Sequence, residues 1–93
     1  MTAGFAATDE AAALTVRMAR HFAHKVPVTE EGDVTVIETR FGAVTLVPEE
    51  QGIRIELRPL DAETESRLRD VVVSHLERFA RSPVAFEWGT PGS

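Results

Sequence analysis

Residues 53–58 alternate strictly between an aliphatic side chain and a charged one. A period of two places the aliphatic side chains on one face of a β-strand and the charges on the other. Residues 34–38 and 43–47 are rich in β-branched residues and are also predicted as strands. Shorter strand patterns cover residues 4–7 and 84–88. The alternation indicates a sheet that is covered on one face and hydrated on the other.

Two other segments repeat their apolar residues every three or four positions, as one face of a helix does. The first follows a cap at Thr8 or Asp9 and ends near Lys25, because the residue before a proline is disfavoured in a helix. The second follows a cap at Asp61 and ends before Pro83. The apolar stripes comprise Ala11, Leu14, Met18, His21 and Phe22 in the first helix, and Leu68, Val71, Val72, His75, Leu76 and Phe79 in the second.

The predicted order is β-α-β-β-β-α-β within one α+β domain, residues 1–88, followed by a disordered tail, residues 89–93. We expect a mainly antiparallel sheet with both helices packed on one face. Counting one reversal at each connection makes the two helices parallel, with their C-terminal turns at the same end of the sheet. His21 in the first helix and His75 in the second are therefore predicted to approach each other.

Composition narrows the classes of function. The chain has 93 residues and a net charge of −5, which suits one small domain and argues against a nucleic-acid partner. No apolar run approaches the roughly 20 residues that cross a bilayer, and residues 1–7 lack the pattern of a secretory signal. A cytoplasmic protein with no membrane role is predicted. The absence of cysteine excludes disulfides, thiolate metal sites and a thiol nucleophile.

The three histidines suggest one candidate site. Imidazole suits transition metals and haem iron, so His21, His24 and His75 could ligate such an ion in a small metal- or haem-dependent enzyme. However, no Asp or Glu has the spacing that completes a three-ligand site, and Lys25 would repel a cation. The simpler interpretation makes His21 and His75 part of the apolar stripes, near helix ends that favour a positive charge.

A basic edge that binds an anion is the other alternative. A rim for a carboxylate, a phosphate or a catecholate would be formed, beside the histidines, by Arg17, Arg20, Lys25, Arg78 and Arg81. The candidate binding residues are His21, His24, Lys25, His75 and Arg78. These bases could instead only complement the negative C-terminal ends of the helices. The chain has no glycine-rich phosphate loop and no serine in a nucleophile-elbow context, so binding is favoured over catalysis.

Four sequence words carry a resemblance to a known family: residues 21–28 (HFAHKVPV), Phe41-Gly42, residues 75–80 (HLERFA) and Trp88. Together they resemble the bacterial domain-of-unknown-function family 2218 over roughly residues 8–88. The family has no established activity, so the resemblance assigns no site residue. Some members look joined to, or encoded beside, siderophore-interacting flavoproteins, which implies a link to iron acquisition. The overall prediction is a small accessory or binding domain rather than an enzyme. An iron–siderophore role, with such a flavoprotein or an anionic small ligand as partner, is the expectation that follows.

Overall fold

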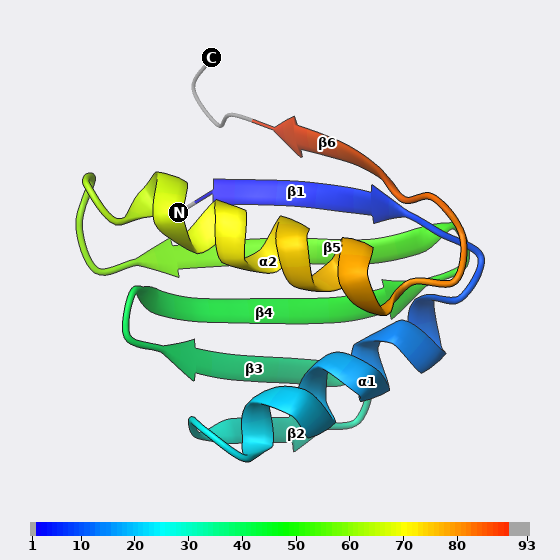
Figure 1. Cartoon of the computed structure of the whole chain (residues 1–93), viewed down its shortest axis with the longest axis horizontal. Helices are drawn as coiled ribbons and strands as arrows, with labels where there is room; N and C mark the ends of the chain where they lie inside the picture. Colours follow the sequence, from blue (N-terminus) through cyan, green and yellow to red (C-terminus); the bar gives the residue numbers. More distant parts are fainter. Residues whose placement is uncertain (1, 90–93) are drawn as a thin grey trace.

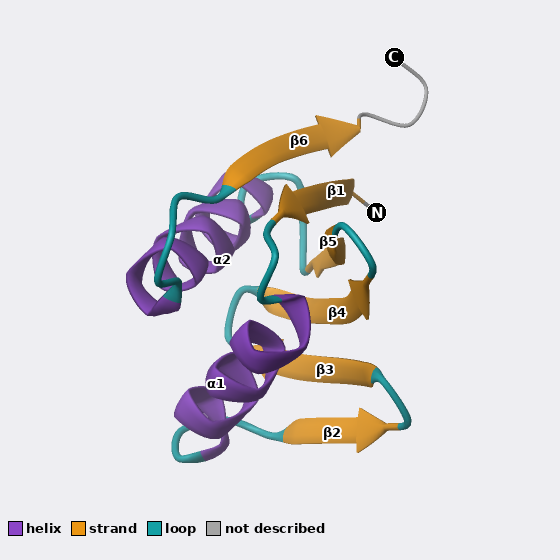
Figure 2. Cartoon of the chain, turned by 90° about the vertical axis from the view of Figure 1, so that its right-hand side faces the viewer, coloured by secondary structure: helices purple, strands orange, loops and turns teal. Residues whose placement is uncertain are grey.

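The computed structural model describes residues 2–89, which form one six-stranded sheet with both helices on the same face (Figures 1 and 2). The predicted α+β fold, with an antiparallel sheet and two helices on one face, is confirmed. The predicted tail beyond Gly89 lies outside the described residues, and Gly89 itself is the last residue of a strand. In chain order the elements are β1 (Thr2–Ala7), α1 (Ala11–Ala23), β2 (Val28–Glu31), β3 (Val34–Thr39), β4 (Gly42–Glu49), β5 (Gly52–Pro59), α2 (Glu65–Phe79) and β6 (Ala85–Gly89).

The sheet contains one strand that the sequence analysis did not predict. The strand order is β2-β3-β4-β5-β1-β6, and every neighbouring pair is antiparallel. The unpredicted strand, β2, lies at one edge and pairs with β3 from Val28 opposite Ile37 to Glu31 opposite Val34. It has a single aliphatic residue, so backbone pairing, rather than an alternating apolar pattern, defines it.

The additional strand reverses the relation between the two helices. Because β2 adds one change of direction between them, α1 and α2 run antiparallel, and the prediction of parallel helices is wrong (Figure 1). Contacts between the helices show the same direction. Arg17, in the middle of α1, donates to the carbonyl oxygen of Phe79 at the end of α2. His21, later in α1, meets His75, which lies earlier in α2.

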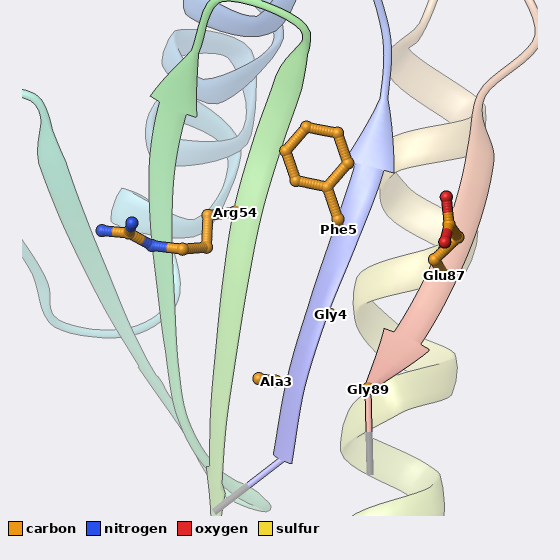
Figure 3. Close-up of a pocket in the computed structure, with 6 residues that line it drawn as sticks. All are labelled: Ala3, Gly4, Phe5, Arg54, Glu87 and Gly89. Atoms are coloured by element: carbon orange, nitrogen blue, oxygen red, sulfur yellow. The ribbon is translucent and has the colours of Figure 1, made fainter. Parts of the chain in front are cut away.

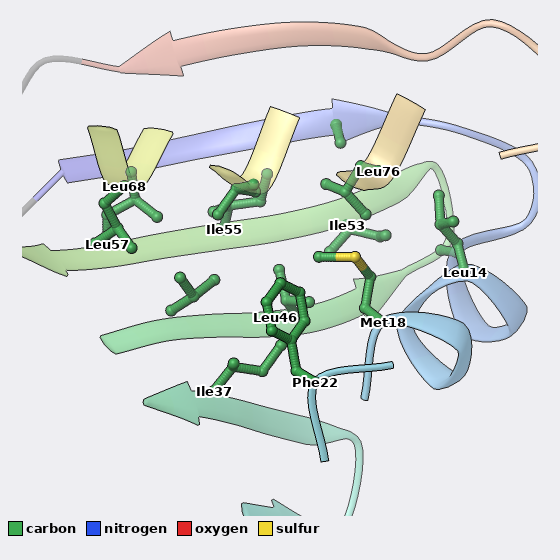
Figure 4. Close-up of a cluster of buried hydrophobic side chains, with 14 residues drawn as sticks. Leu14, Met18, Phe22, Ile37, Leu46, Ile53, Ile55, Leu57, Leu68 and Leu76 are labelled. Atoms are coloured by element: carbon green, nitrogen blue, oxygen red, sulfur yellow. The ribbon is translucent and has the colours of Figure 1, made fainter. Parts of the chain in front are cut away.

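The core lies between the helices and the inner face of the sheet (Figure 4). Leu14, Met18 and Phe22 project from α1 toward the strands, and α2 buries Leu68, Val72 and Leu76. The predicted alternation in β5 is confirmed, because its three aliphatic side chains are fully buried. Each large aliphatic side chain in this core contributes about 1.5 to 3 kcal/mol by leaving water. The sheet supplies Ile37, Val44, Leu46, Ile53, Ile55 and Leu57.

Both predicted helix caps form hydrogen bonds in the turns that precede the helices. The Thr8 hydroxyl accepts from the Glu10 N–H, and α1 begins at Ala11. Similarly, the Asp61 carboxylate accepts from the Thr64 N–H, and α2 begins at Glu65. The predicted caps are wrong, because the N-cap residues are Glu10 and Thr64 and neither helix has a side-chain cap hydrogen bond.

Glu10 fastens the start of α1 to the end of α2. Its carboxylate accepts from Arg17 Nη1 at 2.8 Å and from the Arg81 N–H at 2.8 Å. The same Arg17 nitrogen donates to the Phe79 carbonyl oxygen at 3.1 Å. The hydrogen bond from Arg17, followed by that from the Arg81 backbone, lowers the pKa of Glu10 below its ordinary value. This link fixes the register of the helix pair and so helps to set which α1 and α2 side chains meet.

Candidate functional site

His21 and His75 lie side by side where α1 crosses α2. Their ring centroids are 5.1 Å apart. The ring of His75 also lies 4.8 Å from that of Phe22, and the ring of His21 lies 5.1 Å from that of Phe79. The predicted approach of the two histidines is confirmed. It arises from an antiparallel crossing of the helices, not from two helix ends that lie at the same edge of the sheet.

A pocket of about 450 Å³ opens beside this histidine pair. It lies between the last turn of α1, the middle of α2 and the turn that joins β3 to β4. Four apolar side chains and five polar or basic ones line it, and none of the lining residues is acidic. The apolar residues are Phe22, Val26, Phe41 and Val71, and the others are His21, Lys25, Thr39, Arg40 and His75.

The two permanent cations of the pocket, Lys25 and Arg40, take part in no ion pair with residues 2–89. The Arg40 guanidinium lies 5.1 Å from the centroid of the Phe41 ring, so it is placed over an apolar wall of the pocket. A locally positive pocket on a chain of net charge −5 is an uneven distribution of charge. Such a pocket favours an anion and disfavours a metal cation.

Burial and nearby positive charge favour the neutral form of His21. Burial is the main cause that lowers the pKa of His21 below its ordinary value of 6.5, and the nearby His75 is the next. Positive charge on Lys25, Arg78 and His24 lowers the pKa further. An anion in the pocket would oppose all of these charges, so its binding would favour protonation of His21.

The structure gathers some of the predicted site residues and leaves others outside. His21, Lys25 and His75 line the pocket. His24 and Arg78 are exposed and are not among the lining residues, and the Arg78 guanidinium lies 5.7 Å from the Phe79 ring centroid.

One functional candidate, Arg40, was missed by the sequence analysis. It belongs to the turn between two strands, which was treated only as a connection. The only feature of the sequence that could have pointed to Arg40 is the aromatic residue Phe41 next to it in the turn.

The three-histidine metal site is not assembled. Within residues 2–89, no group of three or more His, Cys, Asp or Glu side chains is placed to hold a metal ion. His24 projects into solvent from the end of α1, while the other two histidines lie against each other. The geometry of residues 2–89 therefore does not support a metal centre that uses all three histidines.

A second hollow, of about 370 Å³, lies on the outer face of the sheet (Figure 3). Phe5 of β1 lies between Arg54 of β5 and Glu87 of β6, and the Arg54 side chain extends away from the other two. Arg54 is paired with Glu49 at 2.9 Å, so its charge is already balanced. The remaining lining residues, Ala3, Gly4 and Gly89, offer no polar side chain. This hollow lacks the converging charges that the helix-side pocket has.

Comparison with known proteins assigns the family. A family model described as "Uncharacterized protein conserved in bacteria (DUF2218)" matches residues 3–89. The chain belongs to the DUF2218 family. The predicted membership is thus confirmed, and the family is an uncharacterised one. No curated protein matches this DUF2218 chain. Within residues 2–89, neither helix is long and apolar enough to cross a membrane.

A solved structure shares the fold of this DUF2218 chain. The NMR structure of PA4090 from Pseudomonas aeruginosa superposes with a TM-score of 0.76 at 23% sequence identity. The match covers 100% of each chain, so all the elements described above belong to the shared architecture. At this identity the likeness concerns the fold alone.

Proposed function

We propose that this DUF2218 chain is a binding module for a small anionic molecule with an apolar body. The observation that carries the proposal is the pocket beside His21 and His75. Apolar side chains line it together with two bases that form no ion pair within residues 2–89, and no lining residue is acidic. Its volume of about 450 Å³ falls within the roughly 300–1,000 Å³ of small-molecule sites.

The pocket residues divide into two binding functions. Lys25 and Arg40 carry permanent charge, and a guanidinium can hold a carboxylate through two parallel hydrogen bonds. Phe22, Phe41 and Val71 supply apolar surface for the body of the ligand. A carboxylate joined to a flat or aliphatic body satisfies both halves of the pocket, whereas inorganic phosphate would use only the basic half.

A benzoate titration followed by ¹⁵N-resolved NMR tests the proposal. We expect amide shifts concentrated at the end of α1, the middle of α2 and the β3–β4 turn. The double variant Lys25→Gln/Arg40→Gln should weaken binding at least about tenfold, because two charge-assisted contacts are lost. Arg58→Gln is the matched control, since Arg58 is an exposed base on the opposite face of the sheet.

Two outcomes would contradict the proposal. One is the absence of localised shifts at millimolar benzoate. The other is a double variant that binds as tightly as Arg58→Gln, because binding would then not depend on the bases of the pocket. Cyclohexanecarboxylate, which keeps the charge but not the aromatic ring, serves as a second probe of the apolar floor.

The family resemblance adds a partner to this proposal, and that partner stays a prediction. A siderophore-interacting flavoprotein or an anionic iron chelate was expected from the resemblance, together with a cytoplasmic location. An anionic chelate belongs to the proposed ligand class by charge. No contact among the described residues favours a protein partner over a free small ligand, so the proposal concerns the small ligand.

A further inference from the structure

His75 has a fixed tautomer when it is neutral. Its Nδ1 lies 2.7 Å from the carbonyl oxygen of Val71, one turn earlier in α2. A carbonyl oxygen only accepts, so Nδ1 must carry the hydrogen of this bond. Neutral imidazole has one N–H, and Nε2 of His75 therefore presents a lone pair.

Nothing in the described chain uses this lone pair. Among residues 2–89, no donor lies within hydrogen-bonding distance of His75 Nε2, and this atom is not sealed from solvent. Contacts with the rings of His21, Phe22 and Phe79 hold the imidazole in place. His75 lines the pocket, and its neutral ring thus brings to this site an unoccupied acceptor nitrogen in a fixed orientation.

The other polar groups of the pocket complete a distinct pattern. Lys25 and Arg40 are donors only. The Thr39 hydroxyl is already occupied, because it donates to the Gly42 carbonyl oxygen at 2.8 Å and accepts from the Phe41 N–H at 3.0 Å. His21 also lines the pocket, but no hydrogen bond among residues 2–89 fixes its tautomer. The site thus combines two cationic donors with one acceptor of fixed position, Nε2 of His75 in its neutral form.

We propose that the ligand carries a hydroxyl or N–H donor in addition to its anionic group, and that this donor bonds to Nε2 of His75. The inference rests on the proposed function, since it assumes that the anionic group lies against Lys25 and Arg40. His75 is then a specificity-determining residue. It discriminates against a ligand that places an acceptor or a bare carbon at this point, because the lone pair of Nε2 would stay unpaired.

The experiment compares matched probes that differ only in this group: benzoate, 3-hydroxybenzoate, 4-hydroxybenzoate and 3-methoxybenzoate. Affinities are measured by NMR titration at pH 8. A neutral hydrogen bond should give at least one hydroxybenzoate about a two- to tenfold advantage over benzoate. 3-Methoxybenzoate keeps the oxygen without its hydrogen, so it should bind no better than benzoate.

Two further measurements assign the effect to His75. In His75→Phe the ratio of hydroxybenzoate to benzoate affinity should fall to about one, whatever the absolute affinities. Histidine ¹⁵N shifts in the unaltered chain should show a bare Nε2 that moves with the preferred hydroxybenzoate much more than with benzoate.

The outcomes separate the two proposals. Equal binding of benzoate and both hydroxybenzoates, or a His75 that carries its hydrogen on Nε2, would overturn this inference and leave the anion pocket standing. Failure of every probe to bind would overturn the proposed function itself.

Discussion

Replacing Gly4 with alanine should loosen the edge of the sheet formed by β1 and β6. Gly4 pairs with Trp88 across these strands. A Cβ built on Gly4 would lie 2.3 Å from Cε3 and 2.5 Å from Cζ3 of the Trp88 ring. Carbon atoms in contact are roughly 3.5 Å apart, so the ring would have to move by about 1 Å.

Two neighbouring side chains restrict this movement of Trp88. The Arg69 guanidinium lies 4.9 Å from its ring centroid, and the ring of Phe86 stacks beside it with an interplanar angle of 4°. Overpacking of this kind destabilises a fold by about 1 to 3 kcal/mol. Replacing glycine by alanine also lowers the conformational entropy of the unfolded chain, which stabilises the fold by about 0.4 to 1 kcal/mol. We therefore expect Gly4→Ala to lower the free energy of unfolding by about 1 to 2 kcal/mol.

Urea unfolding followed by tryptophan fluorescence measures this loss, because Trp88 is the only tryptophan in the chain. Gly89→Ala is the matched control: it lies in the same pair of strands, but the nearest atom to its added Cβ is the Ala3 carbonyl oxygen at 3.7 Å, an ordinary contact. Its free energy of unfolding should stay within about 0.5 kcal/mol of the parent. Equal stability of the Gly4 variant and the parent would refute the close packing of Trp88 on β1.

Three further predictions concern the helix pair and the pocket. Because the pKa of Glu10 is lowered in the fold, its ion pair should stabilise the chain at pH values above 4.5, the ordinary pKa of this group, and this stabilisation should be lost as the pH falls further. Glu10→Gln should therefore be less stable than the parent at pH 7, and the difference should shrink in melts at acid pH. Lys25→Gln should raise the NMR titration midpoint of His21 toward 6.5, since one positive neighbour is removed; an unchanged midpoint would place Lys25 away from this ring. His75→Ala should cost about 1 to 3 kcal/mol in urea melts, and parent-like stability would show that its ring contacts contribute little.

The sequence predicted those strands and helices in which apolar residues recur at regular spacing. Strict alternation identified β5, and the apolar stripes identified both helices. By contrast, β2 was missed because edge strands can be short and charged, and Glu30 and Glu31 give it no apolar face. That single omission reversed the predicted direction of α2 relative to α1. Direction depends on the number of strands between the helices, so one unrecognised strand is enough to invert it.

Only the helical residues of the candidate site could be predicted from the sequence. His21 and His75 belong to apolar stripes, so any packing of both helices on one face brings them toward a common layer. Arg40 could not be assigned to the site, because a turn between strands has no periodicity that places it against a helix. Its position follows from the pairing of β3 with β4, which puts the turn beside the end of α1.

The pKa of His21, measured by NMR with and without saturating benzoate, tests the central claim most directly. In the free chain burial and neighbouring positive charge lower this pKa below 6.5. A bound carboxylate would stabilise the imidazolium, so the midpoint should rise, and benzoate should bind more tightly as the pH falls through this range. A midpoint for His21 that is the same with and without bound benzoate would contradict the account, because the anion would then lie elsewhere.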